Sequence, residues 1–202
     1  MISWKLKNGF LEYDEDTHTY FVDGVVVPSI TQLLKIKYPK KYEGINSDIL
    51  KKAANRGTLV HNLIQLYEEL GLDNCDVEQG DQLKHYIQLK KCEQFEVLGC
   101  EVPIILRYKN LVAAGRLDLV LKEEGREGIG LGDIKTTAYF DTGYLIDQLT
   151  LYKIGYQQTY DEYIGFLRGI YLREDKKRYI RIPIMEDEIY NFLDSILNKG
   201  EK

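Results

Sequence analysis

Gly115-Arg116-Leu117-Asp118 and Gly132-Asp133-Ile134-Lys135 are the two stretches that decide the fold. Each places a carboxylate late in a run of branched apolar residues. Turn residues separate this kind of run from its neighbours, which is the pattern of successive β-strands. We therefore predict three consecutive strands in the middle of the chain, at residues 97–106, 112–121 and 129–134.

Side-chain alternation along these strands indicates which residues share a face. Asp133 and Lys135 are two positions apart and take one face, while Ile134 takes the other. The leucines on either side of Asp118 are expected to face away from it by the same rule. Pairing of the two strands then brings Asp118 and Asp133 together, with Lys135 beside them.

Upstream of these strands, the sequence predicts a β-hairpin and three helices. Residues 10–27 predict the hairpin or a short meander, because Asp23-Gly24 is a strong type I′ turn signal between two β-branched or aromatic triplets. Ser29 is a good N-cap for a short helix that reaches Leu34. A longer helix is expected over 47–70, ended by Gly71, and another over 79–95. The apolar face of the longer helix is predicted from leucines spaced three and four apart, namely Leu59, Leu63, Leu66 and Leu70.

Downstream, the period changes twice more. We predict a helix over 143–159, strands at 163–172 and 178–184 around a charged turn, and a closing helix over 185–197. This order predicts an α/β (α+β) fold, a central mixed β-sheet flanked by helices with an N-terminal β-hairpin. A single domain over residues 1–202 is expected, with the hairpin and a basic segment at 1–46 and the core at 47–202.

Composition excludes several classes of protein. No apolar run is long enough for a membrane span, and the N-terminus lacks the apolar core of a signal peptide, so a cytoplasmic protein without membrane association is expected. The cysteines are Cys75, Cys92 and Cys100, without CxxC spacing. An odd count without this spacing argues against a disulfide framework, a zinc ribbon or an iron–sulfur cluster.

Charge is segregated along a chain of net charge −5. Seven basic residues stand against two acidic ones between Lys35 and Arg56, and six stand against Glu174 and Asp175 between Arg168 and Arg181. Tyrosines are interleaved with both stretches. Such a mixture suits a surface that meets phosphates and stacks on bases, and a solvated charged face is the alternative interpretation.

Two carboxylates and a lysine at the end of a sheet are costly to bury without a purpose. A divalent cation relieves the repulsion between Asp118 and Asp133, and their hard oxygen ligands suit Mg²⁺ or Mn²⁺. Lys135 adds a point charge that can orient a water or stabilise charge on a phosphate. These groups are the equipment of metal-assisted phosphodiester hydrolysis. The alternative is an Asp133–Lys135 ion pair at a strand end, with Asp118 in a turn.

The arrangement resembles the PD-(D/E)XK nucleases, in which an acid on one core strand precedes (D/E)-X-K on the next. Asp118 and Asp133-Ile134-Lys135 match this pattern at a separation of 133 − 118 = 15 positions. Further segments resemble the RecB-like branch, which includes phage exonucleases, in the same order along residues 27–160. They are Val27-Pro28-Ser29-Ile30-Thr31, an "RGT-x-x-H" helix from Arg56 to His61, "G-x-x-D" from Gly115 to Asp118, and "Q-x-x-x-Y" from Gln148 to Tyr152.

The resemblance implies a restriction-endonuclease-like core and a Mg²⁺- or Mn²⁺-dependent deoxyribonuclease, an exonuclease of phage or recombination type. It implies one or two ions held by His61, Asp118, Asp133 and the backbone carbonyl of Ile134, with Glu101 as a further ligand. Lys135 is then catalytic together with the two aspartates. DNA is the expected partner, with a recombination protein and further copies of the chain by analogy to phage relatives. The residues expected to bind DNA are Gln148, Tyr152, Arg56, Lys51, Lys52 and Arg116.

Each of these residues also has a plainer interpretation. His61 lies next to the predicted apolar face and could be a hydrogen-bonded boundary residue. Gln148 and Tyr152 are four apart, which ordinary helix packing explains equally well. Glu101 fits an exposed strand glutamate. For the whole chain, a non-catalytic module that binds nucleic acid or a partner on the same fold remains the alternative, and a structural protein is a second one.

Overall fold

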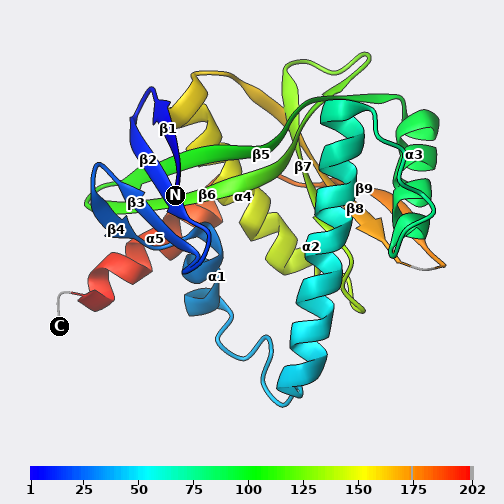
Figure 1. The fold of residues 1–202 in the computed structure, drawn as a ribbon. Coiled ribbons are helices and arrows are strands. Elements are labelled where there is room, and N and C mark those ends of the chain that lie inside the picture. Colours follow the sequence, from blue (N-terminus) through cyan, green and yellow to red (C-terminus); the bar gives the residue numbers. More distant parts are fainter. Residues whose placement is uncertain (174, 201–202) are drawn as a thin grey trace.

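The computed structural model describes residues 1–173 and 175–200. Glu174 of the second basic stretch and the last two positions of the predicted domain therefore lie outside the described residues. Within them, the chain forms two β-sheets and five helices (Figure 1). The predicted α/β class, with a mixed sheet and flanking helices, is confirmed.

The N-terminal sheet is larger than the predicted hairpin. It has four antiparallel strands in chain order, β1 (Ile2–Leu6), β2 (Gly9–Asp14), β3 (Thr19–Val22) and β4 (Val25–Val27). The β3–β4 hairpin turns at Asp23 and Gly24, whose φ values of 52° and 79° fit the predicted type I′ turn. The prediction over 10–27 covers β2, β3 and β4 and missed β1, a short strand whose exposed positions carry the polar residues Ser3 and Lys5.

The main sheet supplies the frame of the site. Its order is β5 (Phe95–Tyr108), β6 (Leu111–Glu123), β7 (Ile129–Lys135), β8 (Ile164–Leu172) and β9 (Lys177–Ile182). All neighbours are antiparallel except β7 and β8, which are parallel and joined by the crossover helix α4 (Thr142–Tyr160). All five strands were predicted, and β5 and β6 run further than expected as one long hairpin.

The remaining helices are α1 (Ile30–Lys37), α2 (Ser47–Leu70), α3 (Gly80–Glu93) and α5 (Glu186–Gly200). Ser29 caps α1 through a capping box with Gln32, as its position predicts. Gly71 ends α2 with a left-handed φ of 68°, also as predicted. Helix α3 is shorter than the predicted 79–95, because Gln94 adopts a left-handed φ of 54° and Phe95 already begins β5.

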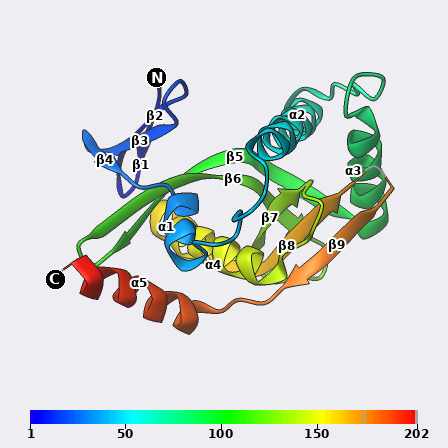
Figure 2. The same cartoon turned by 90° about the horizontal axis from the view of Figure 1, so that it is seen from below.

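The main sheet is covered on both faces (Figure 2). Helices α1, α4 and α5 pack on one face around a single apolar cluster. Helices α2 and α3 pack on the other face over β6, β7 and β8. The N-terminal sheet lies on this second face too, over the far half of the β5–β6 hairpin, where Tyr13 and Val22 contact Ile105 and Ala114. The N-terminal sheet and α2 therefore stand side by side on one face of the main sheet.

The apolar face of α2 differs from the predicted one. Leu63 is buried as expected, but Leu59, Leu66 and Leu70 are exposed, and the other buried residues are Val60 and Ile64. The reason is that the spacing Val60–Leu63–Ile64 also satisfies helical periodicity, and its branched side chains fit the surface formed by α3 and Ile134. His61 follows Val60 and so lies at the edge of the buried face, directed toward β5 and β6.

Within residues 1–173 and 175–200, no helix is both long and apolar enough to cross a membrane.

Candidate metal centre

A break in the alternation of β5 and β6 creates the site. Leu117 packs in the cluster under α4, whereas Leu119 packs under α2 and α3. The two leucines therefore do not share a face, and the predicted alternation around Asp118 is wrong at this point. On β5, Glu101 falls opposite Asp118, between the pairs Cys100↔Leu119 and Val102↔Leu117. Glu101 has a left-handed φ of 47°, which is a strained conformation for a residue with a Cβ.

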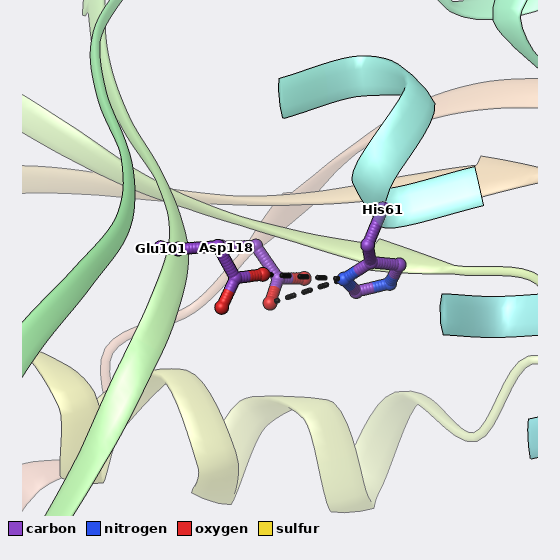
Figure 3. Close-up of side chains that lie close together, drawn as sticks. All are labelled: His61, Glu101 and Asp118. Carbon is purple, nitrogen blue, oxygen red and sulfur yellow. Dashed lines mark ion pairs between the residues drawn. The ribbon is translucent and has the colours of Figure 1, made fainter. Parts of the chain in front are cut away.

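His61 on α2 meets both of these carboxylates (Figure 3). Its Nδ1 lies 3.6 Å from Asp118 Oδ1 and 3.8 Å from Glu101 Oε1. One donor atom from each of the three residues lies within 4.8 Å of the others. The break in strand alternation has thus turned two acids from neighbouring strands toward one imidazole.

The backbone of Ile134 is held between Asp118 and His61. Regular pairing of β6 with β7 ends at Leu119↔Gly132. Beyond it, the Ile134 amide donates to Asp118 Oδ2 at 2.6 Å, and the Ile134 carbonyl accepts from His61 Nε2 at 3.2 Å. In the neutral imidazole, a proton on Nε2 leaves the lone pair on Nδ1, the nitrogen that faces the carboxylates. Metal-binding histidines are commonly oriented by such a hydrogen bond to a carbonyl.

Asp133 and Lys135 form a second, adjacent group. They share the face of Leu131, under α4, and Ile134 packs on the opposite face, so the predicted alternation along β7 is confirmed. Asp133 is buried and forms an ion pair with Lys135. Its carboxylate does not belong to the group formed with His61. The alternative of an Asp133–Lys135 ion pair therefore describes a real contact, but Asp118 lies within β6 and not in a turn.

The charges of the two groups act on one another. Burial raises the pKa of Asp118 to about 7, and the Asp133 and Glu101 carboxylates add to this rise against the opposing effect of His61. Burial by itself lowers the pKa of His61, but Asp118 and Glu101 outweigh it and raise the pKa to about 9. For Lys135, burial also lowers the pKa, and Asp133 and Asp118 reverse the direction to a net rise. The protonation of His61, Asp118 and Lys135 is therefore interdependent.

Glu101 is more enclosed than a surface glutamate. Its side chain is 23% exposed, and its second oxygen lies 3.4 Å from Arg116 Nε. The Arg116 guanidinium lies over the ring of Tyr13 from the N-terminal sheet, at 4.8 Å from the ring centroid. The interpretation of Glu101 as an exposed strand residue is wrong. No signal in the sequence predicts the left-handed backbone conformation of Glu101, and this conformation directs the side chain inward.

Three openings surround the donors. A small cavity of ≈ 10 Å³, about the space of one water, is lined by His61, Glu101, Asp118 and Ile134 among others. A cleft of ≈ 570 Å³ between the N-terminal sheet and α2 reaches His61 and Glu101. A second cleft of ≈ 460 Å³ reaches Lys135 and Gln148 from the other side. Solvent and ligands can therefore reach His61 and Glu101 from one cleft and Lys135 from the other.

Of the residues predicted to bind DNA, Arg116 and Gln148 line these clefts. Gln148 and Tyr152 are buried on α4, and Tyr152 packs closely on Gly115, where an added Cβ would lie 3.0 Å from its ring. Arg56 donates to the Thr136 carbonyl at 3.1 Å. Lys51 and Lys52 are exposed on the first half of α2, away from the donor group.

The donor set fits a hard divalent cation. Two carboxylate oxygens are common ligands of Mn²⁺ and Mg²⁺, and the softer imidazole nitrogen favours a transition metal such as Mn²⁺ over Mg²⁺. An octahedral ion about 2.1 Å from each ligand places neighbouring ligand atoms about 3 Å apart and opposite ones about 4.2 Å apart. The separations of 3.6 and 3.8 Å from His61 Nδ1 lie between these two values, so the side chains would have to close slightly around an ion. A cation would take the place beside Glu101 and Asp118 that a proton on His61 Nδ1 otherwise occupies.

Comparison with known proteins assigns no family. No protein-family profile and no curated protein matches the chain. Among solved structures, a crystal structure of the protein SSO0001 is similar to this chain with a TM-score of 0.36 and 17% sequence identity, covering 82% of this chain and 83% of that one. A likeness this distant says nothing about function.

Proposed function

We propose that this protein is a Mg²⁺- or Mn²⁺-dependent deoxyribonuclease with a restriction-endonuclease-like core of the PD-(D/E)XK, RecB-like type. The proposal rests on the close approach of His61, Glu101 and Asp118. The backbone of Ile134 is hydrogen-bonded to His61 and Asp118, and the buried Asp133–Lys135 pair lies next to this group. A purely structural ion pair needs neither the imidazole nor the strained glutamate.

The residues divide the work of phosphodiester hydrolysis. His61, Glu101 and Asp118 would hold the ion, and Asp133 is the further acid within electrostatic reach. A bound ion lowers the pKa of a water and neutralises the scissile phosphate. Lys135 is the cation that can orient the attacking water or the phosphate, and its raised pKa keeps it charged at neutral pH. The Ile134 carbonyl keeps His61 Nδ1 directed at the carboxylates.

DNA would be held by residues around the two clefts. Gln148 lines the cleft beside Lys135, and Tyr152 supports β6 beneath Asp118. Arg116 is available to a phosphate in the cleft beside Glu101. Lys51, Lys52 and Arg56 extend positive charge along α2. An exonuclease action inside the cell, a recombination partner and assembly of several copies remain proposals that rest on the family resemblance.

Binding of the ion should be visible as thermal stabilisation. A ligand at about 100 times its Kd adds about 2.7 kcal/mol to the free energy of unfolding. For a chain of this size, we expect Mn²⁺ to raise the Tm by roughly 5–10 °C. The His61→Ala variant should lose this rise, and Asp81→Asn, which changes an exposed acid on α3, should keep it. An equal rise in the His61→Ala variant would place the ion elsewhere.

Cleavage is tested with DNA labelled at one end, offered as linear and as closed circular molecules, with Mg²⁺, Mn²⁺ or EDTA. The proposal predicts metal-dependent degradation, and exonuclease action predicts that only the linear form is degraded. Degradation of circles as well would indicate an endonuclease. A salt-sensitive shift of DNA without any cleavage in Mn²⁺ would instead favour the non-catalytic binding module.

A further inference from the structure

The cleft beside Lys135, which we call the tyrosine groove, has an unusual lining. Its walls are the α1–α2 connection, the first half of α2, the segment that follows β7, and α4. The α1–α2 connection and the segment that follows β7 are joined there by an ion pair between Lys41 and Asp141 at 2.8 Å. The residues used below are Tyr42, Tyr139, Tyr144, Ile45, Ile49 and Gln148.

Several of these apolar side chains are exposed in the folded chain. Tyr42 and Tyr139 are 48% and 79% exposed, and Ile45 and Ile49 are 44% and 62% exposed. Two features hold the groove in shape. The Lys41 ammonium lies 3.3 Å from the ring centroid of Tyr144. The Tyr139 carbonyl accepts a hydrogen bond from Thr137 Oγ1 at 2.7 Å. Exposed aromatic and aliphatic surface at a rigid groove marks a place that binds a ligand.

Polar side chains lie at the bottom and near the rim of the groove. The Gln148 side chain is buried, and its Oε1 has no hydrogen-bond partner among the described residues. Lys41 and Lys135 line the groove together with Asp141, and the exposed Lys40, Lys51 and Lys52 adjoin lining residues in the sequence. The groove therefore combines flat apolar faces, a buried acceptor and nearby positive charge.

This combination selects one form of nucleic acid. Paired bases in a duplex present their edges in the grooves, and phosphates cover the outside. Only unpaired bases offer their faces to aromatic side chains, and proteins that bind single strands use a positively charged groove with such stacking. A wall for duplex would need basic residues where the groove has Tyr42, Ile45 and Ile49.

We propose that the tyrosine groove takes the unpaired bases of a single-stranded DNA end, whose backbone passes Lys135 on its way to the acidic site. The inference rests on the proposed nuclease function and names its substrate. Tyr42 and Tyr139 stack on successive bases, Gln148 accepts a hydrogen bond from a base, and the adjoining lysines contact phosphates.

Binding is measured first, in EDTA, by fluorescence anisotropy of a labelled single strand and of a blunt duplex of the same length. The parent protein should bind the single strand at least about fivefold more tightly. Each of Tyr42→Ala and Tyr139→Ala should weaken that binding about fivefold or more, because the loss of one stacked base is worth this much. Tyr139→Phe should retain it. Tyr163→Ala, which removes a 62% exposed tyrosine outside the groove, should leave it unchanged.

Cleavage in Mn²⁺ then separates this inference from the nuclease proposal. Faster degradation of single-stranded than of blunt ends, slowed by Tyr139→Ala and not by Tyr163→Ala, supports both. Equal degradation of both substrates, with all tyrosine variants like the parent, overturns the tyrosine groove and leaves the nuclease standing. No cleavage of any DNA overturns both. Because Tyr42 and Tyr139 are exposed, the variants should keep the parent Tm, which is checked in each preparation.

Discussion

Replacing Asp118 by asparagine is expected to lower the rate of Mn²⁺-dependent DNA cleavage by at least about 100-fold, the smallest loss typical of removing one electrostatic stabiliser. Asparagine preserves the shape of the side chain, and its amide oxygen can still accept from the Ile134 amide. It removes the negative charge that faces His61 and any cation beside it. The variant should therefore fold and fail in chemistry, which circular dichroism and the cleavage assay measure separately.

Two further variants make this result specific. Asp81→Asn changes an exposed aspartate on α3 and should cleave like the parent. Lys135→Met should also be inactive, and it should be less stable than the parent, because it leaves Asp133 buried without its partner. Added Mn²⁺ should recover part of that stability. Full activity in both Asp118→Asn and Lys135→Met would remove the basis of the nuclease proposal.

A second large effect is expected at an ion pair that takes no part in the proposed chemistry. Arg168 on β8 and Glu123 on β6 form a buried ion pair at 2.6 Å, with side chains 4% and 12% exposed. Tyr179 donates to the other Glu123 oxygen at 2.7 Å. Glu123→Gln leaves the Arg168 charge buried without a counter-charge, so the free energy of unfolding should fall by about 3–5 kcal/mol. For a chain of this size, the Tm falls by roughly 10 °C.

Urea denaturation measures this change, and two variants frame it. Lys7→Gln removes an exposed ion pair with Asp161 and should leave the urea midpoint unchanged. The double variant Glu123→Gln with Arg168→Met removes the stranded charge and should regain part of the lost stability. A Glu123→Gln midpoint equal to that of the parent would mean that water solvates Arg168 in the folded protein.

Much of the fold follows from local sequence signals. The branched runs predict all five strands of the main sheet, and the Asp23-Gly24 turn, the Ser29 cap and the Gly71 terminus each occur as predicted. These features depend on one or two neighbouring residues. The buried face of α2 could not be predicted in the same way, because the leucine stripe and the Val60–Leu63–Ile64 stripe satisfy the same period. The partner surface on α3 and Ile134 decides between them.

The candidate site shows the same limit. Alternation along β7 correctly placed Asp133 and Lys135 together. The alternation rule failed on β6, because Asp118 lies where the strand alternation breaks. It also did not predict the left-handed backbone conformation of Glu101 on β5. That conformation depends on the register between β5 and β6 and on α2 packed above them. Neither the strand register nor the packing of α2 can be predicted from the sequence of one strand.

The hydrogen bonds between the Ile134 backbone and the side chains of Asp118 and His61 also bear on the order of folding. His61 and Ile134 are 73 positions apart, and Asp118 and Ile134 are 16 apart, on different elements. The donors thus assemble only after β5, β6 and β7 have paired and α2 has docked on them. Contacts made this late are largely absent from the folding transition state. An ion bound among these donors would slow unfolding and leave the rate of folding nearly unchanged. It would therefore increase the kinetic stability of the folded chain.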